Sequence, residues 1–126
     1  MFRMMLLAGC GGFVGTALRY LVGRVMPHLT HSQFPWATLT VNLVGCFVIG
    51  LLFGAAERGG WLTPQWSAVL ITGFCGGFTT FSTFADDMFL LTQGRQWLPL
   101  AAYVVMSLAV GFVLVWLGRS IVTSNV

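Results

Sequence analysis

The residues best suited to chemistry lie in the third apolar segment, between Gly73 and Phe84. Hydroxyl side chains alternate there with phenylalanines: Thr79, Thr80, Ser82 and Thr83 beside Phe78, Phe81 and Phe84. Hydroxyl groups can donate the hydrogen bonds that water gives a small anion, and the edge of a phenylalanine ring carries the positive side of its quadrupole. A lining of this kind is dry and electropositive but uncharged. It therefore favours an anion over a cation.

The same segment contains three glycines in five positions, Gly73, Gly76 and Gly77. Each glycine weakens a helix by about 1 kcal/mol relative to alanine. We therefore expect a helix break near Gly76 and Gly77, which would expose backbone carbonyls inside the protein. Carbonyl oxygens suit a hard cation such as Na⁺. The alternative is an unbroken helix whose glycines only allow close packing.

Polar groups on two other segments could join this lining. Asn42 lies within the second apolar segment, where its amide could donate to an anion or simply bond to another helix. Tyr103, Ser107 and Gly111 follow one another at four-residue spacing in the fourth segment and predict a thin polar stripe. None of these residues is a general base, a nucleophile with a partner or a metal-ligating side chain. An enzymatic function is therefore not expected.

The first segment carries a charge on a face of small residues. Gly11, Gly15, Arg19 and Gly23 recur at four-residue spacing, which is typical of a groove for close helix packing. A charge within a membrane span is costly unless it faces protein or water. Arg19 therefore either points inward, toward a wet vestibule, or lies near a helix end and extends its side chain to the membrane surface.

These residues must be positioned by membrane-spanning helices. Hydrophobic residues make up 57% of the 126-residue chain and charged residues only 7%, against about 25% in soluble domains. About 20 apolar residues are needed to span a bilayer as a helix. Four segments of that kind, in a single domain, are expected at about residues 4–25, 36–56, 64–91 and 97–117. We expect the first to end before Pro27, and we interpret residues 27–35 as a polar loop. The predicted fold class is an all-α membrane protein of four transmembrane helices.

The arginines predict how the chain inserts. With four spans, Arg3, Arg58 and Arg119 fall on one side of the membrane, and Arg24 and Arg95 on the other, joined by Arg19 if it lies near a helix end. Orientation follows the asymmetry of Lys and Arg, and here there is almost none. A chain without preference inserts both ways, so an antiparallel homodimer follows as a hypothesis.

Several other classes of function are disfavoured. The three cysteines lie in separate segments without metal-ligand spacing, and no basic patch suggests nucleic acid. Both histidines lie in the predicted first loop. No carboxylate occurs in the first, second or fourth span, although proton-coupled antiporters normally need one within the membrane.

The sequence resembles the Fluc family of fluoride channels, also called CrcB proteins, over essentially its whole length. The resemblance rests on three motifs: Gly11-Gly12-x-x-Gly15-x-x-x-Arg19-Tyr20, Val41-Asn42-Leu43, and Gly73-Phe74-Cys75-Gly76-Gly77-Phe78-Thr79-Thr80-Phe81-Ser82-Thr83-Phe84. It implies an antiparallel, dual-topology homodimer with two fluoride pores in a prokaryotic cytoplasmic (inner) membrane. The third helix would be broken at its glycine-rich centre.

The resemblance also assigns roles to residues. A structural Na⁺, which is not transported, would be held by the backbone carbonyls of Gly76 and Thr79. The fluoride path would include Phe81, Phe84, Asn42, Tyr103 and Ser107, and we add Thr80, Ser82 and Thr83 as further lining. Arg19 would lie near a vestibule. Family members can carry a polar residue where this chain has Gly111, so the outer part of the polar stripe departs from the pattern.

The function implied is passive export of cytoplasmic fluoride, which protects the cell from fluoride toxicity. The alternative within transport is a proton-coupled antiporter of fluoride or of small molecules, of the small four-helix dual-topology type. A third class is a membrane assembly factor without transport, for which mutation of Phe81 or Asn42 would have no cost.

Overall fold

The computed structural model describes residues 1–30 and 34–124, and all of the described secondary structure is helical. The helices, in chain order, are α1 (Phe2–Thr30), α2 (Trp36–Arg58), α3 (Pro64–Ser67), η1 (Ala68–Cys75), α4 (Gly76–Phe78), α5 (Phe81–Gln93), α6 (Trp97–Val105), η2 (Met106–Val110) and α7 (Gly111–Ser124). The η segments are wider, π-helical turns that continue the neighbouring α-helices.

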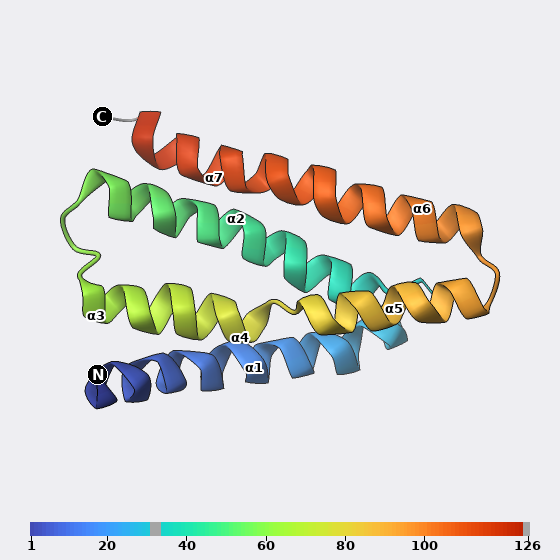
Figure 1. Ribbon diagram of the computed structural model, residues 1–126, viewed down its shortest axis with the longest axis horizontal. Helices are drawn as coiled ribbons and strands as arrows, with labels where there is room; N and C mark the ends of the chain where they lie inside the picture. The colour runs from blue at the N-terminus through green and yellow to red at the C-terminus, as the bar shows by residue number, and fades with distance from the viewer. Residues whose placement is uncertain (31–33, 125–126) are drawn as a thin grey trace.

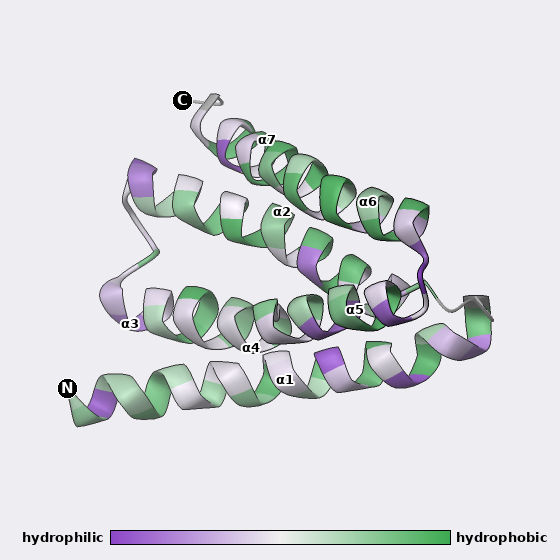
Figure 2. Ribbon diagram, turned by 45° about the vertical axis from the view of Figure 1, so that its right-hand side comes forward, coloured by the Kyte–Doolittle hydropathy of each residue, from purple (hydrophilic) through white to green (hydrophobic). Residues whose placement is uncertain are grey.

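These helices form four rods, each long and apolar enough to cross a membrane: Phe2–Leu29, Trp36–Arg58, Pro64–Gln93 and Trp97–Thr123. The prediction of four membrane-spanning helices is therefore confirmed. Neighbouring rods run in opposite directions, and both termini lie at the same end as the α2–α3 connection (Figure 1). Hydrophobic residues cover most of the rods, and most strongly hydrophilic residues lie near their ends (Figure 2).

The predicted end of the first helix before Pro27 was wrong, because α1 continues through Pro27 to Thr30. A proline within a helix lacks an N–H donor and crowds the carbonyl four residues earlier, which here belongs to Gly23. The packing around Gly23 is open, since no atom beyond its own stretch of helix lies within 4 Å of the place that a side chain there would take. Pro27 and His28 are thus helical, while His31, Ser32 and Gln33 of the expected loop lie outside the described residues.

Glycines bring the rods into close backbone contact along two seams. On α1, a methyl group at Gly11 would overlap the carbonyl of Val69, and one at Gly15 the carbonyl of Phe74. Between α2 and α7, a methyl group at Gly50 would overlap the carbonyl of Val115. Helices in lipid associate through such contacts between small residues.

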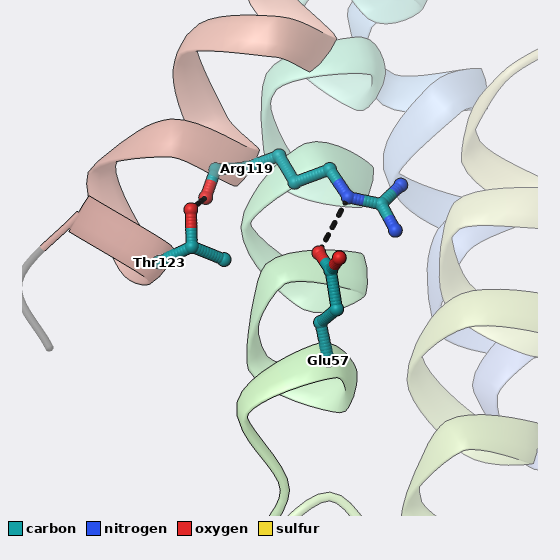
Figure 3. A network of polar contacts seen from close by, with 3 residues as sticks. All are labelled: Glu57, Arg119 and Thr123. Carbon is teal, nitrogen blue, oxygen red and sulfur yellow. Dashed lines mark hydrogen bonds and ion pairs between the residues drawn. The ribbon is translucent and has the colours of Figure 1, made fainter.

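A polar contact joins α2 and α7 at the end that holds both termini (Figure 3). Arg119 Nε donates to Glu57 Oε2 at 2.9 Å, and the Thr123 hydroxyl donates to the Arg119 carbonyl at 3.0 Å. Both charged side chains are about half exposed. The contact thus links the C-terminal part of the fourth rod to the end of α2.

The apolar core within one chain is small. Its fully buried centre is Tyr103, which packs with Leu39, Phe84 and Leu91. Many large apolar side chains are instead exposed, including Phe13 (77%) and Leu98 (82%). Such a surface suits lipid or a second protein rather than water.

Candidate functional site: the break in the third rod

The third rod is interrupted between α4 and α5 (Figure 1). Thr79 (φ −91°, ψ 159°) and Thr80 (φ −152°, ψ 123°) are extended, and α5 begins at Phe81. The interruption does not lie at Gly76 and Gly77, where the glycines led us to expect it, because Gly76 is helical (φ −63°, ψ −35°). Gly77 serves packing instead: a methyl group there would come within 2.7 Å of the Gly12 carbonyl.

Two side chains from neighbouring rods bind the backbone around the interruption. From α2, Asn42 Oδ1 accepts the Thr80 N–H at 2.8 Å, and Asn42 Nδ2 donates to the Thr80 carbonyl at 3.0 Å. From α1, Arg19 Nε donates to the Gly77 carbonyl at 2.9 Å. Backbone that leaves a helix inside an apolar span needs such partners. Of the alternatives open for Arg19, the inward position is the one observed.

Thr79 and Thr80 also satisfy backbone groups with their own side chains. The Thr79 hydroxyl donates to the Cys75 carbonyl at 2.8 Å, below the interruption. The Thr80 hydroxyl accepts the Thr83 N–H at 3.2 Å and thereby caps the N-terminus of α5. It also lies within hydrogen-bond distance of the hydroxyls of Thr83 (3.2 Å) and Ser82 (3.4 Å). The hydroxyls of Thr80, Ser82 and Thr83 thus meet at the start of α5, whereas that of Thr79 bonds to the preceding helix.

A groove of about 290 Å³ runs past the interruption between α2, α5 and the fourth rod. It brings together five of the eight predicted path residues, Asn42, Thr80, Phe81, Phe84 and Ser107, with five others, Gly45, Cys46, Ile49, Thr79 and Leu108. The Ser107 Oγ is buried and has no hydrogen-bond partner among the described residues. A buried hydroxyl without a partner has a donor to offer to a ligand.

The two groove phenylalanines differ in exposure. Phe81 is 78% exposed, whereas Phe84 is 6% exposed, and their ring centroids lie 6.0 Å apart. Phe84 packs in turn against Tyr103, with centroids 5.0 Å apart. One ring therefore faces outward from the chain while the other lines its interior.

Tyr103 does not line the groove. It is fully buried, and its hydroxyl donates to Asp87 Oδ2 at 3.0 Å, which joins the fourth rod to α5. Arg19 and Thr83 also lie elsewhere, around a separate pocket of about 210 Å³ that includes Arg24 and Thr38, with Thr80 between the two cavities. Ser82 is exposed and lines neither cavity.

Sequence reasoning missed Gly45, Cys46 and Ile49 as groove residues. The signal was available, because they follow Asn42 by three, four and seven residues and so share its helix face. It also missed Asp87 as the partner of Tyr103. No regular spacing links residues on two different rods, so only the fold could reveal that pair.

Within the described residues, no group of three or more His, Cys, Asp or Glu side chains could hold a metal ion. The groove is lined by hydroxyl, amide, thiol, aromatic and aliphatic side chains and by no carboxylate. The Ser107 hydroxyl has no partner among the described residues and is free to donate to a small anion.

The chain matches the family model described as "CrcB-like protein, Camphor Resistance (CrcB)" over residues 6–119. It is 44% identical to a Methylobacillus flagellatus protein over 97% of this chain and 95% of the relative. It is 46% identical to a Rhodococcus jostii protein over 90% of this chain and 93% of the relative. An Azobacteroides pseudotrichonymphae protein is 39% identical over 94% of each. These relatives carry the names fluoride-specific ion channel FluC, FluC 2 and FluC respectively.

Proposed function

Because this chain belongs to the CrcB-like protein family, we propose that it is a fluoride-specific ion channel and not an enzyme. The observation that carries the proposal is the groove beside the interrupted third rod, where Asn42, Thr80, Phe81, Phe84 and Ser107 meet. These residues come from three rods, and none carries a charge.

The groove chemistry suits fluoride. A small anion leaves water only if other donors replace its hydration, since an uncompensated charge is very costly in an apolar medium. The Ser107 hydroxyl, buried and unpartnered, is one such donor. The ring edges of Phe81 and Phe84 supply weaker positive charge. A wall without carboxylates avoids repelling the anion.

The direction of flow follows from the membrane potential. A channel is passive, and one elementary charge crossing 100 mV is worth about 2.3 kcal/mol. With the inside negative, fluoride is driven out. Hydrofluoric acid that enters the cell and dissociates there would be returned as the ion, which protects the cell from fluoride toxicity. This function places the chain in a prokaryotic cytoplasmic membrane as a multi-pass protein.

The channel is an antiparallel, dual-topology homodimer with two pores. Supporting this, Arg3, Arg58 and Arg119 belong to one end of the bundle and Arg24 and Arg95 to the other, so the charge bias is slight (Figure 1). The two ends thus carry three and two arginines, and Arg19 lies between them, bonded to the Gly77 carbonyl. The exposed Phe81 would then line a pore completed by the second copy.

A structural Na⁺ at the dimer centre would be held by the carbonyls of Gly76 and Thr79. In a continuous helix the Gly76 carbonyl would accept the Thr80 N–H, but that N–H donates to Asn42 instead. Gly76 is exposed, so its carbonyl is open to a ligand from outside the chain. Backbone carbonyl oxygens are ligands that a hard cation takes, and the ion's positive charge would offset their partial negative charges. Arg19 and Arg24 would attract anions to a vestibule at the smaller pocket.

Fluoride efflux from liposomes that contain the purified full-length protein tests the proposal, with chloride as the control anion. Rapid electrogenic efflux of fluoride alone is expected, and Phe81→Ile should abolish it without unfolding the protein. The same measurement without Na⁺ tests the cation. No flux from folded protein would overturn the channel and favour an assembly factor, and flux that requires a proton gradient would favour an antiporter.

A further inference from the structure

Asn42 makes two hydrogen bonds to a single residue of another rod. Its amide accepts the Thr80 N–H (2.8 Å) and donates to the Thr80 carbonyl (3.0 Å), as a neighbouring β-strand residue would. The Thr80 N–H has no helical partner, because Thr80 is extended and this N–H donates to Asn42. Of the two N–H groups on Nδ2, one is used here, so at most one remains to face the groove.

We propose that Asn42 is a positioning residue: its amide holds Thr80 extended and thereby sets where α5, and with it Phe81, begins. This inference rests on the proposed channel function in one respect, namely the expected effect of Asn42 on fluoride flux. The hydrogen bonds from which it is drawn are independent of that function.

The link from Asn42 to Phe81 passes through Thr80. Thr80 is the N-cap of α5, and its hydroxyl accepts the Thr83 N–H at 3.2 Å. A residue that caps a helix must keep a non-helical backbone, and Asn42 binds both main-chain groups of this residue. Phe81 is the first residue of α5, so its ring position depends on the same backbone.

The hydrogen bond from the Thr80 N–H to Asn42 also determines which carbonyl before the interruption loses its helical partner. The Thr80 N–H cannot serve both Asn42 Oδ1 and the Gly76 carbonyl, and it serves Asn42. Arg19 holds the next carbonyl, that of Gly77, from the opposite side. The interruption is therefore fixed from α1 and α2 together, although no glycine lies within it.

The test is hydrogen exchange at the Thr80 amide, measured on the full-length protein in nanodiscs, beside fluoride and chloride efflux. In the unaltered protein, this amide should be protected although it lies outside any helix. Asn42→Leu removes the acceptor, so exchange at Thr80 should become about tenfold faster, the effect of losing one hydrogen bond. Selectivity for fluoride over chloride should fall with it.

Asn42→Asp and Ser107→Ala separate positioning from direct binding of the anion. Asn42→Asp keeps the acceptor for the Thr80 N–H but turns a second oxygen toward the Thr80 carbonyl, so protection of that amide should be rescued in part, to a level between those of the unaltered protein and Asn42→Leu. Ser107→Ala alters the same groove without touching the interruption, so efflux should fall while exchange at Thr80 stays unchanged.

Two outcomes would overturn the inference. One is an unprotected Thr80 amide in the unaltered protein, which decides the matter even if Asn42→Leu fails to fold. The other is unchanged exchange in Asn42→Leu with lost efflux, which would make Asn42 a direct ligand of the anion. A protected amide in a protein without fluoride efflux would instead refute the channel and leave the positioning role standing.

Discussion

The third rod is held in two different ways along its length. Toward α1, η1 and α4 pack backbone against backbone, because Gly11, Gly15 and Gly77 leave no space for a side chain. Around the interruption and beyond it, side chains of other rods hold it through hydrogen bonds: Arg19 to the Gly77 carbonyl just before it, Asn42 to Thr80 within it, and Tyr103 to Asp87 after it. Glycine seams give rigidity without polar groups, whereas the polar contacts permit a non-helical backbone. The difference separates the part that builds the bundle from the part that bears the groove.

The largest effect should come from breaking the glycine seam. Gly15→Val would drive a side chain into the Phe74 carbonyl, and we expect a loss of about 3 kcal/mol or more, enough to prevent a folded protein. Thermal unfolding in detergent measures it. Gly9→Val is the matched control on the same helix, since no atom lies within 4 Å of the added group. Equal stability of the two variants would show that the seam is not close-packed.

A smaller effect is expected from breaking the buried hydrogen bond between Tyr103 of the fourth rod and Asp87 of α5. Tyr103→Phe removes the hydroxyl that donates to Asp87 and should lower the free energy of unfolding by about 1–2 kcal/mol. Tyr20→Phe is the control, because Tyr20 is 67% exposed. If both variants melt alike, the contact contributes nothing to stability and the contrast between the two parts weakens.

Ser107→Ala tests whether the groove serves transport rather than folding. The Ser107 Oγ has no partner within the described structure, so removing it should leave the melting temperature unchanged or slightly raised. Fluoride efflux should fall about tenfold, the effect of one lost hydrogen bond of about 1.4 kcal/mol in the path. A clear loss of stability with normal efflux would contradict this division of roles.

The smallest effect should follow from the ion pair at the end of the bundle. Glu57 and Arg119 are about half exposed, and pairs of this kind contribute from zero to about 1 kcal/mol. Glu57→Gln should therefore change the free energy of unfolding by less than about 0.5 kcal/mol, and the difference should vanish at high salt. A salt-independent loss above 1 kcal/mol would mean that this surface contact rivals the buried ones.

The rods could be predicted from the sequence because length and hydropathy alone determine whether a helix can span a membrane. The glycine seams were also predictable in part, since Gly11, Gly15 and Arg19 share a face and all three contact the third rod. Gly23 shares that face, but no atom beyond its own stretch of helix lies within 4 Å of the place that a side chain there would take. The spacing of residues indicates which of them share a helix face, but not how much of that face another rod covers.

The interruption itself was harder to locate. Because of the glycines, we predicted the helix break near Gly76 and Gly77, yet the backbone leaves the helix only at Thr79. Glycine weakens a helix everywhere, whereas a break occurs where another rod supplies partners for the freed groups. Asn42 is that partner, and the sequence left open whether it would bind an anion or another helix. The roles of the site residues in transport are predictions, which the experiments above would test.

The even number of crossings has a consequence for protein engineering. Both termini lie at one end of the bundle (Figure 1). Two copies in parallel could be joined into a single polypeptide by a short flexible linker between the first C-terminus and the second N-terminus. For the proposed antiparallel pair those two termini lie on opposite sides of the membrane. A covalent tandem of this protein therefore needs a fifth hydrophobic helix of about 20 residues as its linker.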